Sequence, residues 1–203
     1  MSFHYPFGDV DPLRYEAAGF RITSRTRVLA PSQVLESWPP AWVPQVRMTY
    51  PRHCLHPDDR LRVTGRGLTG EVFATGGDTM IIELTAVADD IADTGDFAPL
   101  NVIELDIGDD TAPLRYVNSS TTAFSRCHLA WIRALVDGWD ARLVPAADRP
   151  AGADIAARFI AETIGIDGPS AFWEDRAFEI EDLGVSTSAT HEWLVGRDGL
   201  PDA

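Results

Sequence analysis

The hydrophobic pattern of this 203-residue chain changes its period near residue 120. Before that point, short apolar runs are separated by turn residues, as in strands joined by hairpins. After it, Phe124, Cys127, Trp131 and Leu135 recur at the spacing of one helix face. Strands followed by helices predict an α+β fold: a mixed, largely antiparallel sheet with helices packed on one face, in a single domain.

The same pattern predicts the extent of each part. An irregular, proline-rich N-terminal part covers about residues 1–57 and includes a short helix at 32–38. The sheet covers about 60–118, the helical part about 120–184, and a C-terminal tail 185–203. The predicted strands lie at 61–64, 70–75, 80–84, 101–107 and 114–117. The predicted helices are 121–137 ending at Gly138, 154–163 ending at Gly165, and 170–183.

Composition excludes several function classes. The chain has 17 basic residues, all of them arginine, against 31 acidic ones, and its net charge is −14. Without lysine it can form no Schiff base and has no P-loop lysine. An acidic chain also lacks the basic surface that nucleic-acid binding requires, so no direct nucleic-acid ligand is expected. With only two cysteines, no signal-peptide pattern and no apolar run of membrane length, we expect a cytoplasmic protein without a membrane segment.

Three short motifs resemble catalytic or ligand-binding patterns but lack a necessary part. Residues 65–70 spell G-x-G-x-x-G, yet strand-like residues follow where a phosphate-binding helix must begin, which favours a glycine-rich hairpin. Residues 89–93 spell D-D-x-x-D, which we interpret as a solvated acidic loop. His191-Glu192 begins a zinc motif that has no second histidine. The chain is therefore predicted to be a binding protein, not an enzyme, with no cofactor and no metal.

One metal-site alternative remains open from the residues. His53, Cys54 and His56 lie close together in the sequence. With His128 they would supply nitrogen and sulfur ligands of the kind that zinc favours. Cys127 lies on the apolar helix face, where a thiol usually behaves as a small buried hydrophobe. A metal-dependent enzyme built on these residues is the weaker alternative.

Two segments carry a resemblance to a known family. Asn118-Ser119-Ser120, followed four residues on by Phe124, resembles the "VNSS" corner of the SUKH superfamily, in particular its fourth family of bacterial immunity proteins. The stretch 166–173, which ends in Phe172-Trp173, is similar to that family's lead-in to a C-terminal helix. The resemblance spans about residues 100–184. Thr121-Thr122 departs from it where a leucine and an acidic residue are usual, and Gly168 interrupts the spacing.

The resemblance implies a protein that binds and neutralises a cognate bacterial toxin by occluding it. Such toxins are often nucleases or nucleic-acid deaminases, which tend to be basic, and a partner of charge −14 would be steered towards them. An intracellular adaptor of the same fold, binding another protein, is the alternative. The structural residues of the resemblance are Asn118, Ser119, Ser120, Phe124, Phe172 and Trp173.

Candidate partner-binding residues combine aromatic side chains with acidic runs, because interface hot spots favour Trp, Tyr and Arg. Core tryptophans and ordinary turns are the competing interpretation of the same residues. The candidates are Trp38, Trp42, Asp89, Asp90, Asp93, Asp96, Asp109 and Asp110.

Overall fold

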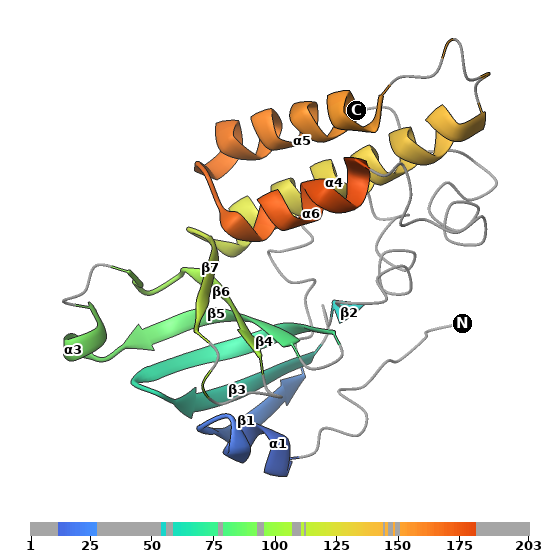
Figure 1. Ribbon diagram of the computed structural model, residues 1–203. Coiled ribbons are helices and arrows are strands. Elements are labelled where there is room, and N and C mark those ends of the chain that lie inside the picture. Colours follow the sequence, from blue (N-terminus) through green and yellow to red (C-terminus); the bar gives the residue numbers. More distant parts are fainter. Residues whose placement is uncertain are drawn as a thin grey trace.

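In the part of the chain that the structure describes, an antiparallel sheet is followed by three long helices (Figure 1). The computed structural model describes residues 12–27, 54–55, 59–76, 79–92, 96–106, 113–143 and 151–181, with residues 111, 145 and 148. The predicted α+β class is confirmed. In chain order the elements are α1 (Pro12–Ala17), β1 (Phe20–Arg27), β2 (Cys54–Leu55), β3 (Asp59–Gly65), β4 (Leu68–Gly76), β5 (Thr79–Val87), α3 (Asp89–Ala92), β6 (Val102–Asp106), β7 (Arg115–Asn118), α4 (Thr121–Leu143), α5 (Gly152–Asp167) and α6 (Ala171–Glu181).

The strands are hydrogen-bonded in the order β1-β3-β4-β5-β6-β7, and the two-residue β2 pairs with β4 beside this path. Each pairing is antiparallel. Ile82 of β5 lies opposite Val72 on one neighbour and Ile103 on the other, so β5 is a central strand. That position explains its nearly continuous apolar run, because most side chains of a central strand covered on both faces are buried and therefore apolar.

The two faces of the sheet enter different apolar clusters. Ile81 and Val117 point to the side that α4, α5 and α6 cover, while Met80 and Ile82 point to the other side. The second side is closed by α1 and by the bending of the sheet itself, with β6 and β7 steeply inclined to β3–β5 (Figure 1). Alternation along a strand places successive side chains on opposite faces. The three long helices α4, α5 and α6 therefore pack on one face, as predicted, whereas the short helix α1 packs on the other.

The glycine-rich stretch 65–70 is a hairpin, as predicted. Arg66 and Gly67 have φ values of 53° and 74° at its turn. Left-handed conformations at both central residues are typical of the type I′ turn, whose twist matches the flanking strands. After Gly70 the chain continues in β4 and begins no helix, so the dinucleotide-binding geometry is absent from this hairpin.

The acidic run after β5 was predicted to be a loop, and this is wrong for its first part. Asp89 to Ala92 form α3, one turn of helix. Ile91 is partly buried against the second cluster, and the amide of Ala88 donates to the carbonyl of Gly67 at 2.8 Å. Burial of Ile91 stabilises this helical turn. The carboxylates of Asp89 and Asp90 also stabilise it, because negative charge is favourable at the N-terminus of a helix. Both remain exposed.

Two predicted helix ends are also wrong. Gly138 does not end α4, which continues to Leu143, and Gly165 lies inside α5. A glycine within a helix costs only about 1 kcal/mol, which packing between α4 and α5 outweighs. Gly168 ends α5, with φ of 86° and its amide bonded to the carbonyl of Ile164. The third helix is described from Ala171 to Glu181, and residues 182 and 183 of its predicted span lie outside the described residues.

The described residues of the N-terminal part, 12–27 and 54–55, form regular elements that were not predicted. Within residues 1–57, α1, β1 and β2 are formed, and β1 pairs with β3 from Phe20 to Arg27. The predicted helix at 32–38 lies outside the described residues. Among the helices that the structure describes, none combines the length and apolar character needed to cross a bilayer.

Candidate partner-binding surface

Asn118 holds the corner at which the sheet passes into the helical layer. It is the last residue of β7 and is buried. Its side-chain carbonyl accepts a hydrogen bond from Nε1 of Trp173 at 3.1 Å, and its Nδ2 donates to Asp167 at 2.9 Å. Its Nδ2 also lies 3.5 Å from Sγ of Cys127. One amide thus joins β7 to α4, α5 and α6, because it carries both a donor and an acceptor.

The carboxylate of Asp167 collects the donors of this corner. It accepts from the amide of Ser119 at 2.7 Å, from the hydroxyl of Ser119, and from the hydroxyl of Tyr116 at 3.4 Å. Ser120 accepts a hydrogen bond from the amide of Ala123 at 3.2 Å and so caps α4. In the sequence, Asp167 belongs to the 166–173 stretch that resembles the family. Nothing in the spacing shows that its carboxylate meets Ser119, 48 positions earlier.

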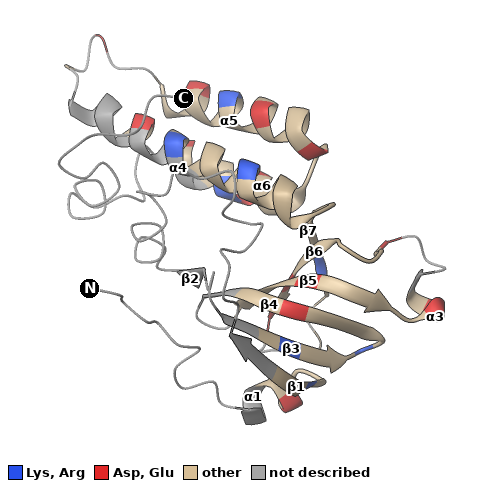
Figure 2. Cartoon of the chain, turned by 180° about the vertical axis from the view of Figure 1, so that it is seen from behind, with Lys and Arg blue, Asp and Glu red and all other residues tan. Residues whose placement is uncertain are grey.

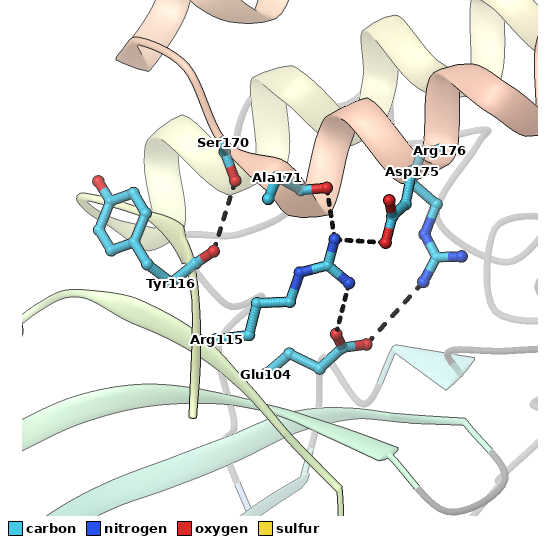
Figure 3. Close-up of polar contacts among 7 residues, drawn as sticks. All are labelled: Glu104, Arg115, Tyr116, Ser170, Ala171, Asp175 and Arg176. Carbon is cyan, nitrogen blue, oxygen red and sulfur yellow. Dashed lines mark hydrogen bonds and ion pairs between the residues drawn. The ribbon is translucent and has the colours of Figure 1, made fainter. Parts of the chain in front are cut away.

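A second polar cluster fastens α6 to the sheet (Figure 3). Arg115 donates to Asp175 at 2.6 Å, to Glu104 at 3.4 Å and to the carbonyl of Ala171. The buried Arg176 lies 3.9 Å from the other oxygen of Glu104. Both guanidinium groups also flank the ring of Phe172, at 5.6 Å and 4.9 Å from its centroid. These contacts fix the inward side of α6 and therefore determine which side faces solvent.

Cys127 is a buried thiol of low reactivity. It lies on the apolar face of α4, as predicted, and burial raises its pKa from 9.0 to about 12. Burial and the nearby charge of Asp167 also raise the pKa of Tyr116. A nucleophilic cysteine needs a lowered pKa, because the thiolate is the reactive form. Cys127 is therefore a packing residue of the corner.

His128 is enclosed by aromatic rings. It is buried, and its ring stacks between Phe124 at 5.5 Å and Trp131 at 5.8 Å. In the part of the chain that the structure describes, no three His, Cys, Asp or Glu side chains are grouped to hold a metal. His53 and His56, and the side chain of Cys54, lie outside it. The metal-site alternative is thus not assembled from described residues.

Only some of the predicted binding residues lie in the part of the chain that the structure describes. Asp89, Asp90 and Asp96 are exposed, the first two on α3 (Figure 2). The structure places these three in one connection between β5 and β6. The other candidates lie outside the described residues: Trp38, Trp42, Asp93, Asp109 and Asp110.

Leu100 lies in the same connection and was not predicted. Its φ is 75°, and its side chain is 61% exposed. Asn101 holds this turn by accepting from the amide of Ala98 at 2.8 Å. A bulky residue in the left-handed region is unusual and costs roughly 1–3 kcal/mol. The sequence carries no signal for it, since leucine is not a residue typical of such a turn.

The outward side of α6 was also missed. Phe172, Trp173 and Ile180 are buried, which leaves Phe178 on the opposite side of the helix, 72% exposed. Its neighbours on that side are acidic: Glu174, Asp175 and Glu181. A signal was present in the sequence, because residues 174–181 place a phenylalanine among carboxylates at spacings of three and four.

Among the residues whose side chains the structure describes, the exposed charged ones are mainly acidic. Eleven exposed Asp or Glu side chains stand against four exposed Arg. The arginines near the corner are only partly exposed or buried and engage carboxylates of the protein itself. This arrangement can attract and hold a basic surface. The exposed acidic residues are Glu16, Asp89, Asp90, Asp96, Asp137, Asp148, Asp154, Glu162, Glu174, Asp175 and Glu181, and the exposed arginines are Arg21, Arg62, Arg126 and Arg158.

Comparison with known proteins adds no relative: no family model, no curated protein and no solved structure matches the chain.

Proposed function

We propose that this protein is an immunity protein of the SUKH type that binds and neutralises a cognate bacterial toxin in the cytoplasm. In this proposal it acts by occlusion, without turnover and without a cofactor. The toxin is a basic protein, such as a nuclease or a nucleic-acid deaminase, because enzymes that act on polyanions need positive surface around their substrate groove.

The observation that carries the proposal is the excess of exposed carboxylates over exposed arginines. A cluster of one sign of charge accelerates the encounter with an oppositely charged partner and disfavours wrong partners. It also suits occlusion, because a negatively charged protein competes with nucleic acid for the same positive groove. Acidic residues lie on both the sheet side, in α3, and the helical side, in α5 and α6 (Figure 2).

The corner supports the family resemblance on which the proposal rests. Its two motifs are distant in sequence but joined in space, since Asn118 bonds both Asp167 and Trp173. A shared network gives a physical reason for both motifs to occur in one chain. The corner contributes a frame for the fold, because Asn118 and Phe124 are buried.

Co-expression tests the proposal. The toxin encoded beside this gene is expressed with and without the protein, and survival and complex formation are measured. We expect rescue of growth and a stable complex. A neighbouring toxin that is neither bound nor neutralised would refute the immunity function, and binding to a non-toxic protein instead would favour the adaptor alternative.

The acidic connection after β5 gives a second test. Replacing Asp89, Asp90, Asp93 and Asp96 with Arg should slow association and flatten its dependence on ionic strength, because rim charges act mainly on the association rate. The control makes the same change of charge on four other exposed acids. Association that responds equally to both variants would show that only the net charge matters and would remove this connection from the interface. The control residues are Glu16, Asp148, Asp154 and Glu162.

A further inference from the structure

Phe178 is the most exposed large apolar side chain among the described residues. It is 72% exposed, against 61% for Leu100 and 47% for Ile164. Isolated exposed apolar residues are common and need no explanation by themselves. The surroundings of Phe178 distinguish it, because Asp175, Glu174 and Glu181 lie three or four positions away on the same side of α6.

Within α6 itself, no basic side chain lies on this side. The one arginine of the helix, Arg176, is buried and faces Glu104 and the ring of Phe172. Asp175 bonds Arg115, so its charge is partly compensated within the protein. Glu174 and Glu181 are exposed acidic groups on either side of the ring. The outward side is thus an apolar centre with a negative rim.

The helix that carries this side is held rigidly. Arg115 and the indole of Trp173 fasten it to β7, and at its far end the backbone of Glu181 closely approaches Gly152 of α5. A rigid element loses little conformational entropy when a partner binds. An aromatic anchor within a polar rim is also the usual arrangement of an interface hot spot.

We propose that the outward side of α6 is the docking surface for the toxin, with Phe178 inserted into an apolar pocket that Arg or Lys side chains of the toxin surround. This inference rests on the proposed function and specifies its surface. Charge complementarity selects the occupant, since a negative rim favours a basic surface. It disfavours the chain's own residues 182–203, which contain four acidic residues and one arginine. At about 16 Å, a helix of 11 residues supplies the centre of a standard interface and not its whole area.

Two variants test the surface against matched controls. Phe178→Ala is compared with Ile164→Ala, which removes another exposed apolar side chain, on α5. The double variant Glu174→Gln/Glu181→Gln is compared with the double variant Asp154→Asn/Glu162→Gln, which removes the same charge from α5. All of these side chains are exposed, so thermal unfolding should show that each variant folds as the wild type does.

Kinetics with the toxin encoded beside the gene separate the two contributions. Phe178→Ala should weaken the Kd by about thirtyfold, mainly through faster dissociation. The glutamine variant should lower the association rate by about fivefold at low ionic strength and less at high ionic strength. Controls within about twofold of wild type are expected. If wild-type protein neutralises the toxin and both α6 variants bind as tightly, the docking surface is wrong while the immunity function stands.

A second probe decides the matter if the toxin does not bind at all, which would refute the proposed function. The probe is a synthetic peptide with two central leucines flanked by arginines, titrated against the full chain and followed by NMR. Shifts confined to residues 171–181 that disappear in Phe178→Ala would support α6 as a docking surface for a basic, apolar-centred partner. Unchanged spectra would overturn the proposed docking surface. Shifts that persist both in Phe178→Ala and in a variant lacking residues 185–203 would also overturn it, because binding would then not depend on Phe178.

Discussion

Replacing Asn118 by Ala should destabilise the protein by about 3 kcal/mol. The change leaves the buried indole N–H of Trp173 without the carbonyl 3.1 Å away that accepts its bond, at a cost of about 1–3 kcal/mol. It also removes the bond to the carboxylate of Asp167, worth about 1.5 kcal/mol or more because the acceptor is charged. Asp167 keeps its hydrogen bonds to Ser119 in the variant. The total loss of stability is therefore expected towards the lower end of the range that these two costs span.

Urea unfolding followed by far-UV circular dichroism measures this loss. We expect a lower midpoint with an unchanged slope, and a melting temperature lower by about 6–12 °C for a chain of this length. Thr122→Ala is the control, since Thr122 is exposed on the first turn of α4. In a double-mutant cycle, Trp173→Phe should be less harmful when Asn118 is already Ala, because the indole N–H has then lost its acceptor.

The reasoning would be refuted by an Asn118→Ala variant within about 0.5 kcal/mol of wild type, the range of ordinary surface changes. Additive effects of Asn118→Ala and Trp173→Phe would equally show that the indole bond does not stabilise the corner.

Three further predictions concern stability. In a Cys54→Ser background, Cys127 should resist a thiol reagent at pH 8 until the protein unfolds. Folding raises the pKa of Cys127 from 9.0 to about 12. The contribution of its neutral thiol to the free energy of unfolding is therefore fully present below pH 9 and is lost as the pH rises towards 12. Cys127→Ala should flatten this decline. Glu104→Gln should cost about 2 kcal/mol and Asp175→Asn under 1 kcal/mol in chemical unfolding, because their side chains are 12% and 67% exposed; equal losses would contradict this. Gly165→Ala should raise stability by about 0.5–1 kcal/mol, as an open helix position. Gly168→Ala should lower it by about 1–3 kcal/mol, as φ is 86° there, and calorimetry showing the same sign for both would be contrary evidence.

The sequence predicted the elements whose pattern is local. Alternation and turn residues located the strands from β3 to β7, and the spacing of Phe124, Cys127 and Trp131 located α4. These signals are strong because each face of a strand or helix must satisfy its own environment over several residues. The hairpin at Gly67 followed from the same kind of evidence, since a turn with φ above zero favours glycine.

Element ends and the early strand were predicted less well. Gly138 and Gly165 were expected to end helices, but a glycine ends a helix only where the chain must turn, and packing against neighbouring helices decides that. The strand β1 alternates in sequence, yet its proline-rich surroundings concealed it, and its partner β3 lies about 40 residues away. Pairing at that distance leaves little trace in a local window.

The sequence alone determined the α+β class, the order of sheet and helices, and the acidic, lysine-free character of the chain. Only the tertiary structure decided that Asp167 and Trp173 meet Asn118, and that Phe178 faces solvent among carboxylates. The reason is physical. Periodicity records which side of an element is apolar, whereas contacts between distant residues, and the side a helix leaves uncovered, depend on how complete elements pack together.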